Sequence, residues 1–187
     1  YTTIDSRLQS SANAAVSNGL IAYTERHGYL GAEAHWDLTS LSLEEQQKKL
    51  NKTISYGVLK PALVLSTTDK NAEILLKDGR TAVLEWEGMS WAKPFKTVNR
   101  MGKSPKKTTD ILKTGDLIRI REKEGKLHLS QIPKVQGSLV ALNPENGAIV
   151  SLVGGFNFTH NKFNRSTQAV RQPGSNFKPF IYAAALN

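Results

Sequence analysis

The spacing of apolar residues changes twice along the chain, from a helical period to strand alternation and then to longer apolar runs. Residues 1–5, YTTID, predict a strand. A helix should follow, with Asp5 or Ser6 capping its start and Gly28 ending it. Its apolar positions at helical spacing are Leu8, Ala15, Val16, Leu20 and Tyr23. A second, short helix is expected at residues 42–50, SLEEQQKKL, whose serine and third-following glutamate have capping-box spacing.

Strand alternation dominates from about Val58 to residue 132. Pro61 interrupts the first run, VLKPALVLST, and should place its start at a sheet edge or a bend. Two hairpins are predicted, with turns at Asp78-Gly79 and Glu124-Gly125. The second hairpin should bury Leu117, Ile118, Ile120, Leu127, Leu129 and Ile132, and should point Arg119, Arg121 and Lys126 to solvent. Short strands at this spacing favour a small barrel of the OB-like type.

The last third of the chain begins after Pro133 with GSLVALNPENGAIVSLVGG, which predicts two strands apolar enough to be buried on both faces. A polar loop, FNFTHNKFNRSTQ, follows, and the chain closes in a helix-like apolar segment, FIYAAAL. The fold class expected from the whole pattern is α+β, with a mainly-β barrel between helical segments. Because the chain opens directly into a strand and closes inside a helix, we expect it to be a piece of a longer protein.

The composition excludes several classes of function. Apolar residues make up 39% of the chain and charged residues 22%, which is ordinary for a globular protein. No apolar run reaches the roughly 18 residues that a membrane span needs. There is no cysteine, so disulfides and thiolate metal sites are excluded. The histidines lack metal-ligand spacing, and we read His27, His35, His128 and His160 as surface or hydrogen-bonded residues.

Most of the formal net charge of +9 lies within residues 93–134, which carry twelve Lys or Arg and only four acids. Such a basic face is either a solvated surface or a binding surface for nucleic acid, anionic lipid or an acidic protein. Trp86, Trp91 and Phe95 lie near Lys93 and Lys96 in the sequence. Basic residues interleaved with aromatic ones are typical of surfaces that bind single-stranded nucleic acid, so a nucleic-acid-binding OB-like module is an alternative function.

The candidate chemistry is a serine and a lysine three positions apart, Ser175 and Lys178, in AVRQPGSNFKPFIYAAALN. In the first turn of a helix the two share a face, and the free N–H groups there favour a developing oxyanion. A serine nucleophile needs a base, and burial or nearby cations would let the lysine serve as one. The flanking Phe177, Phe180 and Ile181 would help to exclude water from the pair. Pro179 should fix the helix start close to this point.

The S-x-x-K spacing by itself has little specificity, because it occurs three times in the chain. The other two pairs are Ser90 with Lys93 and Ser104 with Lys107, both in the basic loop region. Only Ser175 follows an apolar strand pair and opens an apolar helix. Ser175 and Lys178 are therefore the strongest of the three pairs as a candidate nucleophile and base, although spacing alone does not decide between catalysis and a chance match.

The words RQPGSNFKPFIYAAAL closely resemble the active-site signature of class A penicillin-binding proteins, the bifunctional peptidoglycan synthases. GSLVALNPENGAIVSLVGG resembles the strand pair that opens their transpeptidase domain, and TTIDSRLQSSANAAV resembles the linker from the glycosyltransferase domain. Members of the 1a type carry an inserted OB-like domain. The resemblance implies a linker strand and helix at 1–27, an OB-like domain at 28–134, and the first part of a serine β-lactamase-like transpeptidase domain at 135–187.

The resemblance implies an acyltransferase that needs no cofactor. Ser175 would attack the D-Ala-D-Ala end of a peptidoglycan stem peptide, Lys178 would assist proton transfer from the serine, and β-lactams would acylate the same serine. The parent protein would be anchored in the bacterial inner membrane and face the periplasm. An outer-membrane lipoprotein activator is the partner implied for the OB-like domain, and no nucleic acid is expected.

The family also requires an S-x-N triad and a K-T-G strand, both after the S-x-x-K. Two triplets match these patterns but precede Ser175: Ser11-Ala12-Asn13 and Lys113-Thr114-Gly115. We interpret both as chance matches and expect the partners beyond residue 187, so that the chain alone would be inactive.

Overall fold

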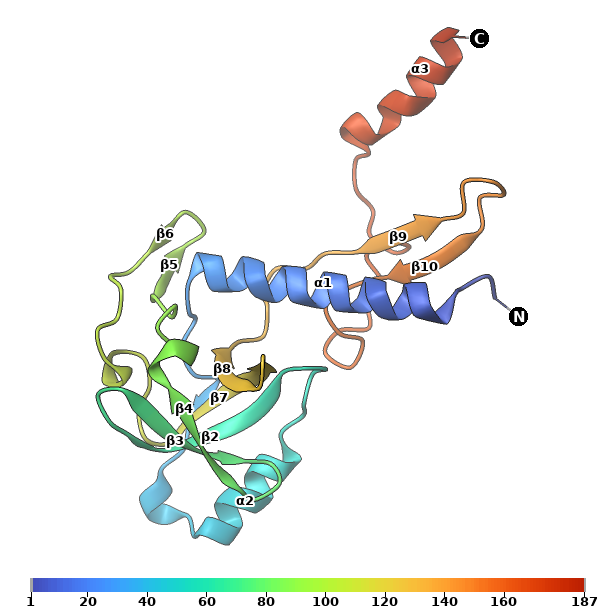
Figure 1. Cartoon of the computed structure of the whole chain (residues 1–187). Helices are drawn as coiled ribbons and strands as arrows, with labels where there is room; N and C mark the ends of the chain where they lie inside the picture. The colour runs from blue at the N-terminus through green and yellow to red at the C-terminus, as the bar shows by residue number, and fades with distance from the viewer. Residues whose placement is uncertain (1, 187) are drawn as a thin grey trace.

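The computed structural model describes residues 2–186 and divides them into a barrel, a long helix with a strand pair beside it, and a projecting C-terminal helix (Figure 1). The helices are α1 (Ser6–His27), α2 (Leu43–Lys52) and α3 (Lys178–Leu186). The barrel strands are β1 (Ala34–His35), β2 (Lys60–Thr67), β3 (Asn71–Leu76), β4 (Thr81–Glu85), β7 (Asp116–Lys123) and β8 (Lys126–Ser130). Two antiparallel pairs complete the fold: β5 (Phe95–Thr97) with β6 (Arg100–Met101), and β9 (Leu139–Leu142) with β10 (Ile149–Val153).

The barrel is one antiparallel sheet in the order β1-β7-β2-β3-β4, with β8 paired to β7 and packed against β4. Both predicted hairpin turns are present. Gly79 has φ +85° in the loop of residues 77–80 between β3 and β4. Glu124 and Gly125, between β7 and β8, have φ +54° and +73°, as a two-residue type I′ turn requires. Pro61 is the second residue of β2, an inner strand. Pairing with β3 begins only at Ala62, so Pro61 has a strand neighbour on the β7 side alone.

The second hairpin does not point its arginines to solvent, and that prediction is wrong. The side chain of Arg119 is 3% exposed and forms an ion pair with Glu33 at 2.7 Å. Arg121 pairs with Glu25 of α1 at 2.8 Å. Strand β7 is buried on both faces because its alternate residues point to different neighbours. Ile118 and Ile120 enter the barrel core, and the other face packs under α1, α2 and the segment before β1.

The start of the chain is only partly as expected. Asp5 caps α1, Gly28 ends it, and the expected capping box of α2 is formed. The strand predicted at residues 1–5 is not a strand over the described residues 2–5, and Tyr1 lies outside them. These residues run extended beside β10 instead. The N–H of Asp5 donates to the carbonyl of Val150 at 3.0 Å, and the Thr3 hydroxyl donates to that of Ile149 at 2.6 Å.

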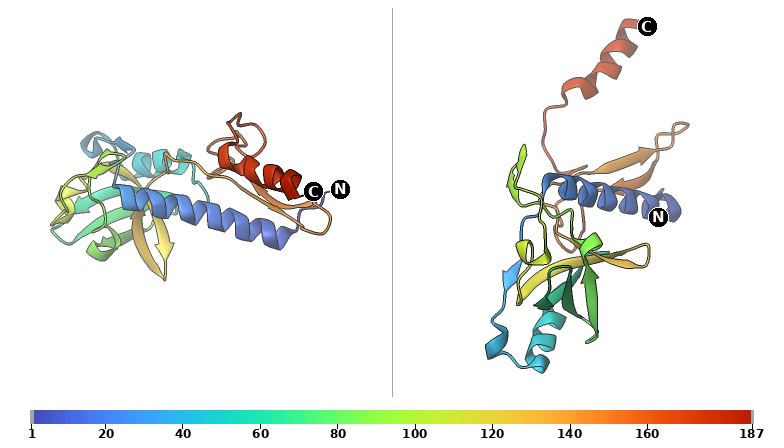
Figure 2. Two further views of the ribbon diagram at one scale, coloured as in Figure 1. Left: turned by 90° about the horizontal axis from the view of Figure 1, so that it is seen from above. Right: turned by 60° about the vertical axis from the view of Figure 1, so that its left-hand side comes forward.

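Helix α1 lies alongside β10 in all three views (Figures 1 and 2). The side chain of Gln9 in α1 forms hydrogen bonds with the backbone of β10, as a neighbouring strand would. The carboxamide of Gln9 accepts a hydrogen bond from the N–H of Leu152 at 2.9 Å and donates to the carbonyl of the same residue at 3.0 Å. The outer face of the strand pair is open, with Val140, Leu142 and Ile149 exposed, so the expectation of burial on both faces is wrong for the described residues.

Candidate functional site

Ser175 lies in a single 3₁₀ turn, Gly174–Phe177, that leads directly into α3. The N–H of Lys178 donates to the carbonyl of Ser175, so the two residues stack along one side of the turn at i, i+3. Gly174 has φ +53°, which lets the chain enter the turn tightly. Pro179 is the second residue of α3, where its missing N–H costs no helical hydrogen bond, as the sequence predicted.

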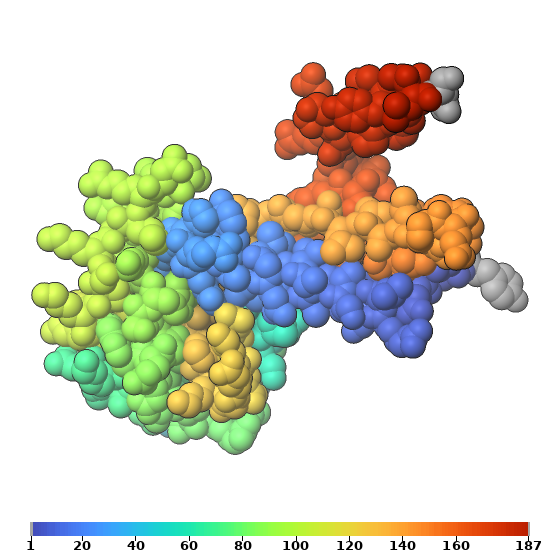
Figure 3. Space-filling view, turned by 45° about the horizontal axis from the view of Figure 1, so that its top comes forward, coloured from blue at the N-terminus to red at the C-terminus, as the bar shows by residue number. Residues whose placement is uncertain are grey.

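The surroundings of Ser175 and Lys178 are open. Among residues 2–186, neither side chain forms a hydrogen bond with the other or with a third group. The apolar neighbours that were expected to exclude water are themselves exposed: Phe177 by 54%, Phe180 by 67% and Ile181 by 54%. The space-filling view shows α3 as a separate lobe joined to the body through a narrow neck (Figure 3). The described residues therefore present the serine and the lysine without a base contact or an enclosing wall.

The two triplets that match the S-x-N and K-T-G patterns lie in other parts of the structure. Ala12 is buried within α1, and Asn13 faces the loop after β10. The Lys113-Thr114-Gly115 triplet forms the turn into β7, in the barrel and away from α3 (Figure 1). Gly115 has φ +93° and donates to the Val64 carbonyl at 2.8 Å, and a Cβ there would lie only 2.3 Å from the Trp36 carbonyl oxygen. A structural requirement thus accounts for this glycine.

Two of the three aromatic residues near the basic residues, Trp86 and Trp91, pack against the barrel core, whereas Phe95 is half-buried in β5. Trp91 donates from Nε1 to the Leu129 carbonyl at 3.2 Å and meets the ring of Tyr29 edge-on. Trp86 packs against the same core, and burial raises the pKa of Tyr29. The two tryptophan rings therefore do not form an exposed surface on which bases could stack. The alternation of aromatic and basic residues in the sequence no longer favours binding of single-stranded nucleic acid. Between residues 96 and 107 the exposed cations are Lys96, Arg100, Lys103, Lys106 and Lys107.

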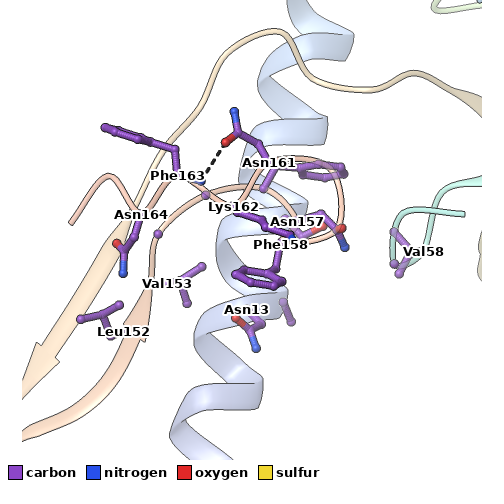
Figure 4. A pocket seen from close by; sticks show the side chains of 16 residues that line it. Asn13, Val58, Leu152, Val153, Asn157, Phe158, Asn161, Lys162, Phe163 and Asn164 are labelled. Atoms are coloured by element: carbon purple, nitrogen blue, oxygen red, sulfur yellow. Dashed lines mark hydrogen bonds between the residues drawn. The ribbon is translucent and has the colours of Figure 1, made fainter. Parts of the chain in front are cut away.

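A cavity that the sequence did not predict lies between α1, the end of β10 and the loop at 154–164 (Figure 4). Its volume is about 540 Å³. Its polar lining consists mainly of the carboxamides of Asn13, Asn157, Asn161 and Asn164, together with Lys162. The only signal in the sequence was the density of asparagine in FNFTHNKFN, which we read as a polar loop.

The described part of the chain, residues 2–186, holds no cluster of three histidine or acidic side chains suited to a metal ion. Within the same range, none of the helices combines the length and the apolarity required of a membrane span.

Comparisons with known proteins agree with the barrel and with the strand pair and helix that follow it. The model of the penicillin-binding protein OB-like domain matches residues 29–135, and that of the penicillin binding protein transpeptidase domain matches residues 137–187. The chain therefore belongs to the class A penicillin-binding protein family. Within that family its relatives are of the 1A type, as the resemblance implied, and the expected fold class is confirmed.

Two relatives and one solved structure illustrate the match. Penicillin-binding protein 1A of Vibrio cholerae is 46% identical over the whole of this chain and 24% of its own length. For penicillin-binding protein 1A of Escherichia coli the identity is 42%, again over the whole chain and 22% of the relative. The crystal structure of penicillin-binding protein 1A from Haemophilus influenzae superposes with a TM-score of 0.81 at 37% identity, over 99% of this chain and 26% of that one. The chain thus spans about a quarter of the length of these relatives.

Proposed function

We propose that this chain supplies the nucleophile segment of a peptidoglycan transpeptidase. The observation that carries the proposal is the transpeptidase-domain match over residues 137–187, which includes Ser175, Lys178 and the strand pair before them. In the reaction, the Ser175 hydroxyl oxygen attacks the penultimate D-Ala carbonyl of a stem peptide. An acyl ester forms at the serine, and the terminal D-Ala leaves as the amine. The amine of a second stem peptide then attacks the ester and forms the cross-link, which returns the hydroxyl.

Lys178 takes the proton of the hydroxyl as the ester forms. The i, i+3 stacking of the two residues supports this role, because it places both side chains on one side of the turn. A lysine accepts a proton near neutral pH only where its ammonium form is destabilised by burial or by other cations. The open surroundings of Lys178 supply neither, so the chain by itself should not acylate.

The same proposal extends to the whole protein that such a segment serves. It would join this transpeptidase to a glycosyltransferase, be anchored in the bacterial inner membrane, and work at its periplasmic face. β-Lactams would acylate Ser175 in place of a stem peptide.

The test is intact-mass spectrometry after exposure to benzylpenicillin. The protein is a chimera in which this chain replaces the matching segment of the Vibrio cholerae relative. We expect one acyl adduct on the chimera, none after Ser175→Ala, and none on the 187-residue chain alone. The matched control is Ser104→Ala, which removes another S-x-x-K serine and should leave the adduct in place. An adduct that survives Ser175→Ala would refute the assignment of the nucleophile.

The exposed cations at residues 96–107 favour a second role for the barrel, as the docking surface for an acidic protein such as a lipoprotein activator. Charge reversal at Lys103 and Lys106 in the chimera should weaken stimulation by the activator and leave penicillin acylation intact. Loss of acylation instead would show that the residues act on the fold.

A further inference from the structure

The β5–β6 hairpin projects from the barrel beside the end of α1 (Figures 1 and 2). Two of its side chains are apolar and exposed, Val98 by 69% and Met101 by 39%. Val98 lies in the turn between the two strands, at the tip of the hairpin. Among residues 2–186, neither side chain belongs to a buried hydrophobic cluster of the barrel. The hairpin therefore presents apolar surface that the barrel does not use.

A small apolar cavity lies against the hairpin and extends this surface. It is bounded by the hairpin, the last turn of α1 and the segment that leaves the barrel, and its volume is about 160 Å³. The walls are mainly apolar or aromatic side chains: Tyr23, Leu30, Phe95, Val98 and Val135. The ring of His27 stacks on that of Tyr23 at 3.9 Å between centroids, so the two form one flat wall. Because Tyr23 and Val135 are each 37% exposed, apolar surface continues from the hairpin tip across the cavity to both neighbouring segments.

The charge around this apolar surface is positive. Residues 88–109, which contain the hairpin, carry six Lys or Arg and no acid. Four exposed cations lie on the three segments that bound the cavity: Arg26, Lys96, Arg100 and Lys134. Within residues 2–186, none of the four forms an ion pair, and no acidic side chain lines the cavity. Glu25, the neighbouring acid on α1, is paired with Arg121 at 2.8 Å.

An apolar centre with cations around it is complementary to the surface of an anionic lipid bilayer. Lipid phosphates attract the cations, and the region just below them takes up apolar side chains. The long stems of lysine and arginine let the charged ends stay at the phosphates while an apolar neighbour goes deeper. An acidic protein would match the cations equally well, but it would also need a pocket shaped for Val98. A bilayer interface accepts that side chain without one.

From this combination we infer that the face formed by the hairpin tip, the end of α1 and residues 134–135 binds an anionic lipid surface. Val98 would enter the interface, Lys96 and Arg100 would lie at the level of the phosphates, and the contact would cover the apolar cavity from water. The inference goes beyond the proposed acyl transfer and does not rest on it, because Ser175 and Lys178 do not line this face. Docking of an acidic protein at residues 96–107 would use some of the same cations, and the experiment separates the two.

The test is cosedimentation of the full chain with vesicles of phosphatidylcholine that contain phosphatidylglycerol, and with vesicles of phosphatidylcholine alone. We expect binding to the anionic vesicles and at least about tenfold weaker binding to the neutral ones. Raising the salt concentration should release the chain, because salt screens the attraction between the cations and the phosphates.

A fluorescent label reports whether the hairpin tip enters the bilayer. Because the chain has no cysteine, Val98→Cys provides a single site for an environment-sensitive fluorophore. Its emission should shift to shorter wavelength on the anionic vesicles, as the label leaves water. The matched control is Val83→Cys, since Val83 is 50% exposed on β4 and does not line this face, and its label should show no shift.

The decisive variant is Lys96→Gln with Arg100→Gln, which removes two cations from the hairpin and should weaken binding about 20-fold or more. The matched control is Lys48→Gln with Lys52→Gln. It removes the same charge from exposed positions of α2, which lies across the barrel from the hairpin (Figure 1), and should weaken binding less than about threefold. Val98→Ser keeps all charges and should weaken binding about fivefold through the loss of apolar contact alone.

A thermal melt of each variant separates loss of binding from loss of folding, and Arg100→Gln alone serves if the double variant is unfolded. Absence of binding to the anionic vesicles, binding that leaves the label at position 98 unshifted, or equal weakening in both charge variants would each overturn the inference. Poly-glutamate supplies the acidic-protein arm. A shift of the label with poly-glutamate but not with vesicles would assign the face to an acidic protein and would overturn the inference as well. Ser175→Ala should bind the vesicles as the wild-type chain does, so that a failure of the acyl-transfer proposal leaves this one standing.

Discussion

The barrel and the C-terminal segment of this molecule differ in the number of tertiary contacts that stabilise them, although both were predicted from equally clear sequence patterns. The barrel has a six-stranded sheet with buried hydrophobic clusters packed against it, and two ion pairs that join β7 to Glu33 and to α1. Helix α3 has no buried residue, no side-chain cap and a length of nine residues. An isolated helix shorter than about 12–15 residues is marginal in water. Stability is thus concentrated in the barrel, whereas the candidate nucleophile lies in the segment with the fewest contacts.

The sharpest test of this difference is a pair of identical substitutions. Ile74→Ala empties a fully buried position in the barrel core and should lower the free energy of unfolding by about 2–5 kcal/mol. Ile181→Ala removes a largely exposed side chain of α3 and should change it by less than about 0.5 kcal/mol. Urea denaturation followed by tryptophan fluorescence measures both. Comparable losses would show that α3 packs on the body and that the contrast is wrong.

Removing the ion pair between Arg119 and Glu33 tests how much the second face of β7 contributes to the free energy of unfolding. Glu33→Ala leaves a guanidinium that is 3% exposed, with the Ile54 carbonyl as its remaining hydrogen-bond partner among residues 2–186. The expected loss is about 3 kcal/mol in the free energy of unfolding. Glu122→Ala on the same strand region is the matched control, because its side chain is exposed and unpaired in the described structure, and it should change stability by less than about 0.5 kcal/mol. Equal effects would mean that the pair contributes nothing.

The same two regions show which features local sequence could predict. The turns at 78–79 and 124–125 and the caps at Asp5 and Ser42 depend on residues within a few positions, and all were predicted. The burial of Arg119 was not, since its partner Glu33 is 86 positions away and alternation alone assigns the arginine to solvent. The amide-lined cavity was missed for the same reason. Its polar lining residues come from α1 and a loop more than a hundred residues later, and nothing local indicates that they meet.

For the candidate site, the sequence could predict the turn, the i, i+3 stacking and the position of Pro179, because these are local. It could not predict the environment of Lys178. The apolar neighbours at 177, 180 and 181 indicated enclosure, yet enclosure depends on what packs against α3, and every residue of α3 is exposed. The roles of Ser175 and Lys178 in acyl transfer remain predictions.

A smaller effect on stability is expected from helix capping, because α2 has a side-chain cap and α3 has none. Ser42→Ala removes the hydroxyl that accepts from the N–H of Glu45 at 3.3 Å and should destabilise α2 by about 1 kcal/mol. Amide exchange over residues 43–52, measured by mass spectrometry, should accelerate in this variant while exchange in α3 stays unchanged. The control is Ser40→Ala, since Ser40 precedes the helix and caps nothing in it. Unchanged exchange in α2 would contradict the prediction.

The smallest expected effect is a pH dependence confined to α2. The N–H and the hydroxyl of Ser42 both donate to the Glu45 carboxylate at 2.8 Å, and these bonds lower the pKa of Glu45 below its ordinary value. A carboxyl group with a lowered pKa in the folded state contributes stability above its ordinary pKa, and this contribution disappears as the pH falls through the lower, folded value. Glu45→Gln keeps a side chain that can cap and removes the titration.

Between pH 5 and pH 3, amide exchange in α2 should therefore accelerate more in the wild-type chain than in Glu45→Gln, with rates corrected for the intrinsic effect of pH. Helix α3 has no acidic residue in its first turn and should show no difference between the two proteins. Equal acceleration in α2 would mean that Glu45 is not held by Ser42 in solution, and the capped helix would then differ from α3 by its packing alone.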